Sequence, residues 1–89
     1  MRFTSLYYKD KKIVDNKAID KILITEGLSW LIDCEIENAE IEIKHKTIIW
    51  KSGTLYSGNW YYGIWESGIF HGTWESGIWI DGVRKGKIK

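Results

Sequence analysis

A five-residue glycine period in the second half of the chain constrains the fold more than any other feature. Eight of the nine glycines follow residue 50, at positions 53, 58, 63, 68, 72, 77, 82 and 86. A bulky residue, most often tryptophan, stands two positions after most of them, so the unit reads G-x-W-x-x. Residues 63–71 and 72–80 are identical at six of nine positions, which indicates an internal duplication.

This period is incompatible with an α-helix, because side chains five residues apart would point in different directions around the helix axis. A glycine at every fifth position would also cost about 1 kcal/mol each time. We therefore expect short strands joined by tight turns, with the tryptophans pointing inward. Single hairpins of this size are marginal in water, so the units should stack around a shared core.

Alternating residues precede the glycine period. Every second residue of segment 28–36 is apolar, which predicts a half-buried strand. These residues are Leu28, Trp30, Ile32, Cys34 and Ile36. The alternation resumes after residue 38, and we expect Ala39, Ile41 and Ile43 to face inward.

The N-terminal segment is expected to cap the array, as repeat arrays require. Residues 2–8 predict a strand, and residues 12–24 fit either two strands or a short helix. Asp15 is a candidate N-cap for such a helix, with Ile19, Ile22 and Leu23 on one face. We favour a strand followed by a second strand or a single helical turn, and hence a β cap.

Taken together, these patterns predict one all-β domain of stacked short strands over residues 1–89. Its parts are the cap (1–27), acidic-faced strands (28–50) and the Trp/Gly repeat (51–89). A chain of this length buries only about 60% of its extended surface, so six Trp, five Tyr and two Phe must supply most of the core. Strand order, parallel or antiparallel pairing and oligomeric state stay open at this point.

Two repeat families share features with the second half of the chain. The stretches GIWESGIFHGTW and GIWIDGVRKGKI resemble the MORN pattern G-x-W-x-x-G-x-x-x-G, whose units are antiparallel hairpins packed as a meander. The five-residue step, preceded by CEIENAEIEI, is similar to pentapeptide-repeat solenoids and to the Gly-x-Trp arrays of phage structural proteins. The resemblances imply an antiparallel meander or a small β-solenoid, and neither implies a ligand.

Charged residues are sorted into blocks, although the net charge is only +1. Residues 26–43 contain no Lys or Arg, and their carboxylates would follow one face of an extended chain at steps of about 6.6 Å. The candidate partner-binding carboxylates are Asp33, Glu35, Glu37, Glu40 and Glu42. Such a face could dock onto the basic groove of a nucleic-acid-binding protein. The alternative is a charged face that only keeps the sheet soluble.

Two tyrosine pairs and a basic terminus complete the candidate contact residues. In each pair, Tyr7-Tyr8 and Tyr61-Tyr62, one ring must face outward. The candidate basic patch consists of Arg84, Lys85, Lys87 and Lys89, with a solvated chain end as the alternative. We do not expect direct binding of nucleic acid, because the net charge is near zero.

The reactive side chains do not form a recognisable catalytic or metal-binding set. Cys34 is the only cysteine and stands at an inward position, so we expect a buried thiol and no intramolecular disulfide. His45 and His71 fit no metal-ligand spacing, and we expect no metal or cofactor. We find neither a signal peptide nor an apolar run of membrane-spanning length, which predicts a cytoplasmic protein, in the host cytoplasm if phage-encoded.

The sequence therefore predicts a non-enzymatic module that binds a protein partner through an acidic and aromatic surface. A small phage or bacterial protein of this kind could block a host or defence protein, as an anti-CRISPR-type inhibitor does. One alternative is a structural component of a virion or homo-oligomer, and a further one is a carbohydrate-binding module.

Overall fold

Strands dominate the computed structural model, which describes residues 1–85 and 87–88, without the side chains of the last two. Strands hold 49% of the residues and helices 16%, so the domain is sheet-rich but not all-β. The elements are β1 (Phe3–Tyr8), β2 (Lys11–Ile13), α1 (Asn16–Thr25), α2 (Ser29–Ile32), β3 (Glu35–Lys44), β4 (Thr47–Ser57), β5 (Asn59–Trp60), β6 (Ile64–Trp65), β7 (Ile69–Phe70), β8 (Thr73–Trp74), β9 (Ile78–Trp79), β10 (Val83–Arg84) and β11 (Lys87–Ile88).

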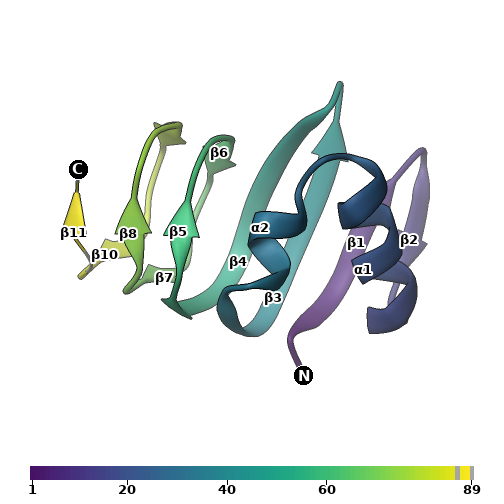
Figure 1. Cartoon of the computed structure of the whole chain (residues 1–89), viewed down its shortest axis with the longest axis horizontal. Helices are drawn as coiled ribbons and strands as arrows, with labels where there is room; N and C mark the ends of the chain where they lie inside the picture. Colours follow the sequence, from purple (N-terminus) through teal and green to yellow (C-terminus); the bar gives the residue numbers. More distant parts are fainter. Residues whose placement is uncertain (86, 89) are drawn as a thin grey trace.

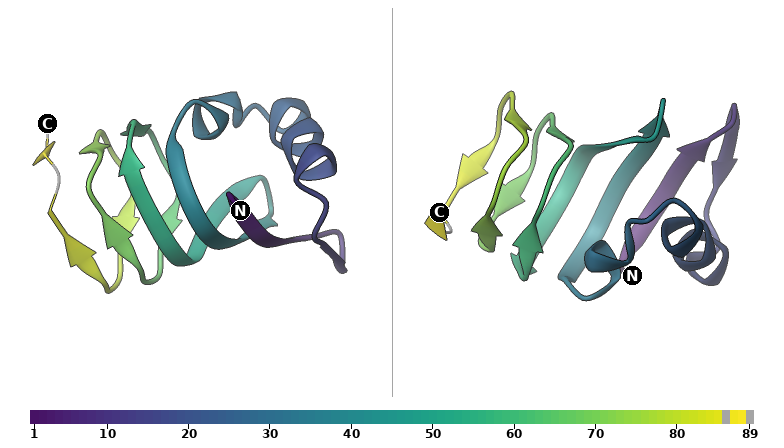
Figure 2. Two further views of the ribbon diagram at one scale, coloured as in Figure 1. Left: turned by 90° about the horizontal axis from the view of Figure 1, so that it is seen from below. Right: turned by 45° about the horizontal axis from the view of Figure 1, so that its top comes forward.

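Two sheets form opposite layers of the molecule. The larger sheet has the order β10-β7-β4-β3-β1-β2, with β6 pairing β4 and β9 pairing β6. The smaller sheet has the order β11-β8-β5. In Figure 1 the N-terminal hairpin and the C-terminal strands lie at opposite ends of the long axis. The left view of Figure 2 shows α1 and α2 in the same layer as β5 and β8.

The short strands after β4 pair only in parallel, and the partners are separated by three units of the glycine period. Ile49 pairs with Ile64, and Ile64 pairs in turn with Ile78. The pairs β4–β7, β5–β8, β7–β10 and β8–β11 have the same separation. The chain therefore passes through three short strands before it returns to the side of the molecule where it began. We call each such segment of three glycine units a coil.

Aromatic side chains from successive coils stack inside the molecule, as the glycine period predicts for the tryptophans. Trp50 and Trp65 are parallel, with ring centroids 4.6 Å apart, and Trp79 stacks on Trp65 at 5.5 Å. Trp60 and Trp74 stack in the same way at 5.8 Å. Rings of different stacks meet edge to face, an arrangement that suits the aromatic quadrupole.

Glycine is required where one coil crosses the next. At Gly68 φ is +115°, and an added Cβ would lie 2.4 Å from the carbonyl oxygen of Gly53. Gly82 has the same relation to Gly68, with φ of +114° and the same 2.4 Å approach. The recurring serine has a related role, because the Ser67 hydroxyl donates to the carbonyl of Lys51 in the preceding coil. The corners therefore bring successive backbones into direct contact.

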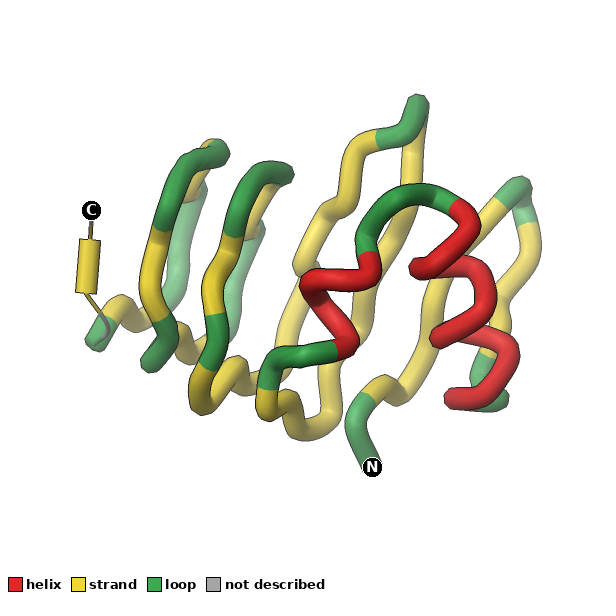
Figure 3. The backbone as a smooth tube through the Cα atoms, in the orientation of Figure 1, coloured by secondary structure: helices red, strands yellow, loops and turns green. Residues whose placement is uncertain are grey.

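The N-terminal cap contains more helix than the sequence predicts. Asp15 caps α1 by accepting a hydrogen bond from the Lys17 amide, and Ile19 and Leu23 are buried, which confirms the helical alternative for this segment. A β cap with at most a single helical turn is therefore wrong, since α1 has ten residues. Figure 3 shows both helices following the first hairpin.

The predicted strand over residues 28–36 is also wrong in its first part. Residues 29–32 form α2, and the strand begins only at Glu35. Leu28 and Leu31 are both fully buried, a spacing that suits a helical turn and not an alternating strand. Within β3 the prediction is confirmed, because Ala39, Ile41 and Ile43 are buried.

Candidate binding surfaces

The outer face of the larger sheet has one continuous row of side chains across five strands. Register pairs join Tyr7 to Glu42, Glu42 to Ile49, Ile49 to Ile64 and Ile64 to Ile78. Their chain neighbours Ile41, Trp50 and Trp65 point into the core and are fully buried, so this row faces outward. We call these five residues the outer row.

Exposure increases toward both ends of the outer row. Tyr7 is 42% exposed and Ile78 is 60% exposed, whereas Ile49 in the middle is 9% exposed. Two further apolar residues, Ile69 and Val83, pair with each other on β7 and β10 and are also exposed. The last two coils thus present several aliphatic side chains to solvent. Large contiguous apolar patches on a soluble domain commonly mark interaction sites.

Of the predicted carboxylates, Glu42 belongs to the outer row, whereas Glu37 pairs with Thr54, which in turn pairs with Ile69. Glu35, Glu37, Glu40 and Glu42 alternate with buried residues on either side of a bulge at Asn38, which keeps all four on the outer face. Asp33 is exposed and follows the last turn of α2.

Lys51 neutralises one end of this acidic face. Its ammonium lies 3.3 Å from Glu42 and 3.8 Å from Glu66. The hydrogen bond to Glu42 and the charge of Glu66 raise the pKa of Lys51. Glu35 and Glu37 lie farther along β3, where they are exposed. They are therefore the carboxylates most available to a partner.

The predicted tyrosines are not brought together. Tyr7 belongs to the outer row, whereas Tyr8 faces the helices and donates a hydrogen bond of 2.5 Å to Glu26, which raises the pKa of Tyr8. Tyr61 and Tyr62 follow β5 and contact Trp30 of α2 edge to face at 5.6 Å. They are exposed, but they follow β5 of the smaller sheet, whereas Tyr7 lies on the larger one.

The predicted basic patch is only partly described. Arg84 does not project freely into solvent: its guanidinium lies 4.4 Å from the ring centroid of Trp79 and 5.1 Å from that of Trp74. In the register of the parallel strands, Arg84 pairs with Phe70, and Phe70 pairs with Leu55. Lys85 is exposed, whereas Lys89 and the side chain of Lys87 lie outside the described residues.

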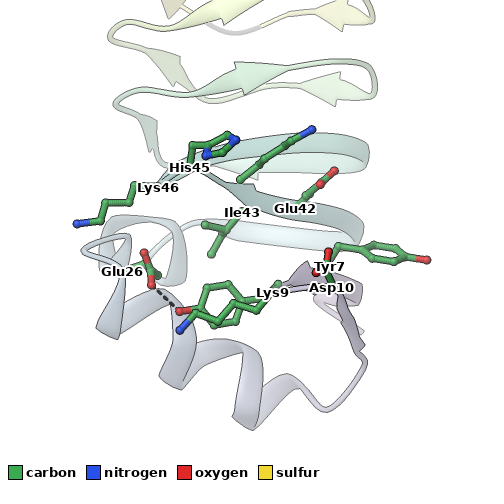
Figure 4. A pocket seen from close by; sticks show the side chains of 10 residues that line it. Tyr7, Lys9, Asp10, Glu26, Glu42, Ile43, His45 and Lys46 are labelled. Atoms are coloured by element: carbon green, nitrogen blue, oxygen red, sulfur yellow. Dashed lines mark hydrogen bonds between the residues drawn. The ribbon is translucent and has the colours of Figure 1, made fainter.

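A notch of about 590 Å³ opens where the first two hairpins end, and the sequence did not reveal it. Tyr8 and Ile43 are register partners near the ends of two parallel strands, so the two hairpin turns lie at the same end of the sheet. Lys9 and Asp10 border one side, and residues 44–46 border the other (Figure 4). No sequence motif marks such a notch, because it depends on pairing between strands far apart in the chain.

The isolated reactive side chains have structural surroundings. Cys34 is buried, and loss of solvent raises the pKa of its thiol to about 11. His71 stacks on Tyr56 with 6.0 Å between ring centroids. In the described part of the chain, no group of three or more His, Cys, Asp or Glu side chains is placed to hold a metal ion.

Comparison with known proteins finds no counterpart: no protein-family model, curated protein or solved structure matches this chain. Among residues 1–85 and 87–88, no helix has the length and apolar character needed to cross a membrane.

Proposed function

We propose that this chain is a non-enzymatic binding module that engages a protein partner through the outer row and the carboxylates beside it. The observation that carries the proposal is that the row exposes large apolar side chains at its two ends, Tyr7 at one and Ile78 at the other. An apolar centre with a charged rim is the usual anatomy of a protein interface. Aromatic residues such as tyrosine are also frequent among the residues that dominate binding energy.

The scaffold for this surface is proposed to be a small β-solenoid. Parallel pairing between strands three glycine units apart supports this reading over an antiparallel meander. Stacked aromatic rings and corner glycines in contact make such a scaffold stiff. A stiff surface loses little conformational entropy on binding.

Charge complementarity indicates the chemistry of the partner. Glu35 and Glu37 are exposed on β3, and Glu37 shares a register column with the exposed Ile69, so the matching surface should carry Lys or Arg beside apolar side chains. Basic grooves of nucleic-acid-binding proteins have this character. Stoichiometric blocking of such a groove, as by a phage inhibitor of the anti-CRISPR type, is the specific form that we favour.

The test compares two substitutions of equally exposed isoleucines. Ile78 on the outer row and Ile24 on α1 are both 60% exposed. A partner captured from lysate by the wild-type chain is purified and its affinity is measured. We expect Ile78→Asp to weaken binding by at least about tenfold and Ile24→Asp to leave it unchanged. Equal effects, or capture of no protein alongside clear hits on a glycan array, would contradict the proposal.

Assembly is the second candidate function. Among the described residues, β9 pairs with β6 on one side only, which leaves a strand edge near the C-terminal end of the coils. A second copy could add there, with the exposed side chains of Ile80 and Val83 in the contact. Mass measurement in solution separates the candidates, because assembly requires an oligomer whose mass falls after Val83→Asp.

A further inference from the structure

Backbone strain is concentrated around the notch at the hairpin ends. Five residues other than glycine have positive φ in the described structure, and four of them border this notch: Lys9, Asp10, His45 and Lys46. The fifth, Asn38, lies in the bulge of β3. Non-glycine residues in this region cost about 1–3 kcal/mol each and collect at functional sites.

The two turns carry unusual residues for their geometry. Each is a two-residue hairpin turn with positive φ at both central positions, the type I′ geometry that strongly favours Asn-Gly. Here the central pairs are Lys9-Asp10 and His45-Lys46. Stability alone would select other residues, so these side chains are better explained by what they can contact.

One lysine from each turn reaches the same side of the notch. Figure 4 shows Lys9 and Lys46 on the side that also carries Glu26, whereas Tyr7 and Glu42 point to the other side of the sheet. The ammonium of Lys9 lies 5.2 Å from the ring centroid of Tyr8. Among the described residues, neither of these lysines forms an ion pair. The two ammonium groups are therefore available to an anionic ligand.

Glu26, the carboxylate on this side, already has a partner. It accepts the hydrogen bond from the Tyr8 hydroxyl, which leaves its remaining lone pairs to accept from a ligand. The register partners Tyr8 and Ile43 form an apolar surface beside it. This side of the notch thus combines two cations, one acceptor and an apolar contact, whereas the rest of its lining includes Asp10, Glu42 and Lys44.

We propose that the notch binds a small phosphate-bearing ligand that also carries hydroxyl groups. The ammonium groups of Lys9 and Lys46 would hold the phosphate oxygens, and Glu26 would accept from a hydroxyl. The volume of about 590 Å³ lies in the range of small-molecule sites. Because the charge of Glu26 disfavours a long polyanion, a single phosphate group fits better than a nucleic-acid strand.

The test is a titration of the full-length ¹⁵N-labelled chain with inorganic phosphate, adenosine monophosphate and acetate at constant ionic strength. We expect saturable amide shifts at residues 9–10 and 43–46 with both phosphate compounds, tighter binding of the nucleotide and none with acetate. Shifts that do not saturate, or that are equal with acetate, would overturn the proposal. A second test uses a single-stranded oligonucleotide, and tighter binding than the mononucleotide would also overturn it.

Two variants separate binding from folding. Lys9→Gln/Lys46→Gln removes both ammonium groups and should weaken phosphate binding by at least about tenfold. His45→Asn/Lys46→Gly installs the preferred turn residues, so it should stabilise the fold while it also weakens binding. Lys17→Gln is the matched control, because Lys17 is exposed at the end of α1 opposite Glu26. Unchanged affinity in both notch variants would refute the site.

Discussion

At the scale of single residues, the corner glycines have the least freedom to change. Two independent constraints act on Gly68: its φ of +115° and the proximity of the Gly53 carbonyl. The tryptophans are constrained by packing, and Trp50, Trp60 and Trp65 are fully buried. Within the described part of the chain their indole nitrogens have no hydrogen-bond partner, a cost that the stacked rings must offset.

Gly68→Ala is expected to destabilise the fold by more than about 2 kcal/mol, because the new methyl group meets backbone and the φ angle becomes strained. Gly27→Ala is the control, since φ is also positive (+77°) but nothing lies within 4 Å of an added Cβ. There the loss should be about 1 kcal/mol. Urea denaturation of both variants measures the difference, and equal losses would show that the coil contact is unimportant.

Cys34 gives the protein a pH dependence on the alkaline side. Its thiol pKa is raised to about 11, whereas a thiol in the unfolded chain ionises near its ordinary value of about 8.5. Between these values the unfolded state has lost a proton that the folded state keeps, so stability falls as the pH rises. We expect the free energy of unfolding to fall less steeply in Cys34→Ala over this range. If the free energy of unfolding fell equally steeply with pH in the wild-type protein and in Cys34→Ala, the assignment of this pH dependence to Cys34 would be contradicted.

At the scale of elements, local signals predicted some features well. The alternation along residues 39–43 indicated a strand, whereas Asp15 with Ile19 and Leu23 indicated a helix only as an alternative to the β cap that we favoured. The strand predicted over residues 28–36 was wrong because the segment fits two patterns. Every second residue is apolar, as in a strand, but Leu28 and Leu31 are also apolar at helical spacing. Short apolar segments do not distinguish helix from strand by period alone. The notch was not predictable, because it arises from the pairing of β1 with β3.

Asp15→Ala tests the local signal for α1. Its carboxylate accepts the amide of Lys17 at 3.0 Å, and loss of such a cap costs about 1 kcal/mol. Lys17→Ala is the control, because it keeps the amide and the cap. Thermal unfolding followed by circular dichroism should show a lower midpoint for Asp15→Ala alone. A similar midpoint shift in Lys17→Ala would contradict the capping role.

At the scale of the whole molecule, cap and coils share one interior. Trp30 of α2 meets Trp60 edge to face at 5.3 Å, and Trp60 stacks on Trp74 of the following coil. On the sheet side, β3 joins β1 of the cap to β4, and β4 pairs with β6 and β7 of the coils. Neither part can lose its structure without exposing the other.

Unfolding should therefore be a single cooperative transition. Tryptophan fluorescence reports mainly on the coils, where five of the six tryptophans lie, and helical circular dichroism reports on α1. We expect the two signals to change at the same urea concentration. Two separate midpoints would show that the cap and coils fold independently.

The separation between register partners also sets the step by which a chain of this kind can change in length. Inserting one whole coil would add one layer to the stack, and each indole would stay in its own column. Inserting a single glycine unit would shift every later side chain by one column. Arg84 would then lie within a stack of aromatic rings, whereas it now packs against Trp74 and Trp79. The array can therefore lengthen only by three glycine units at a time, and such an insertion leaves both ends of the molecule unchanged.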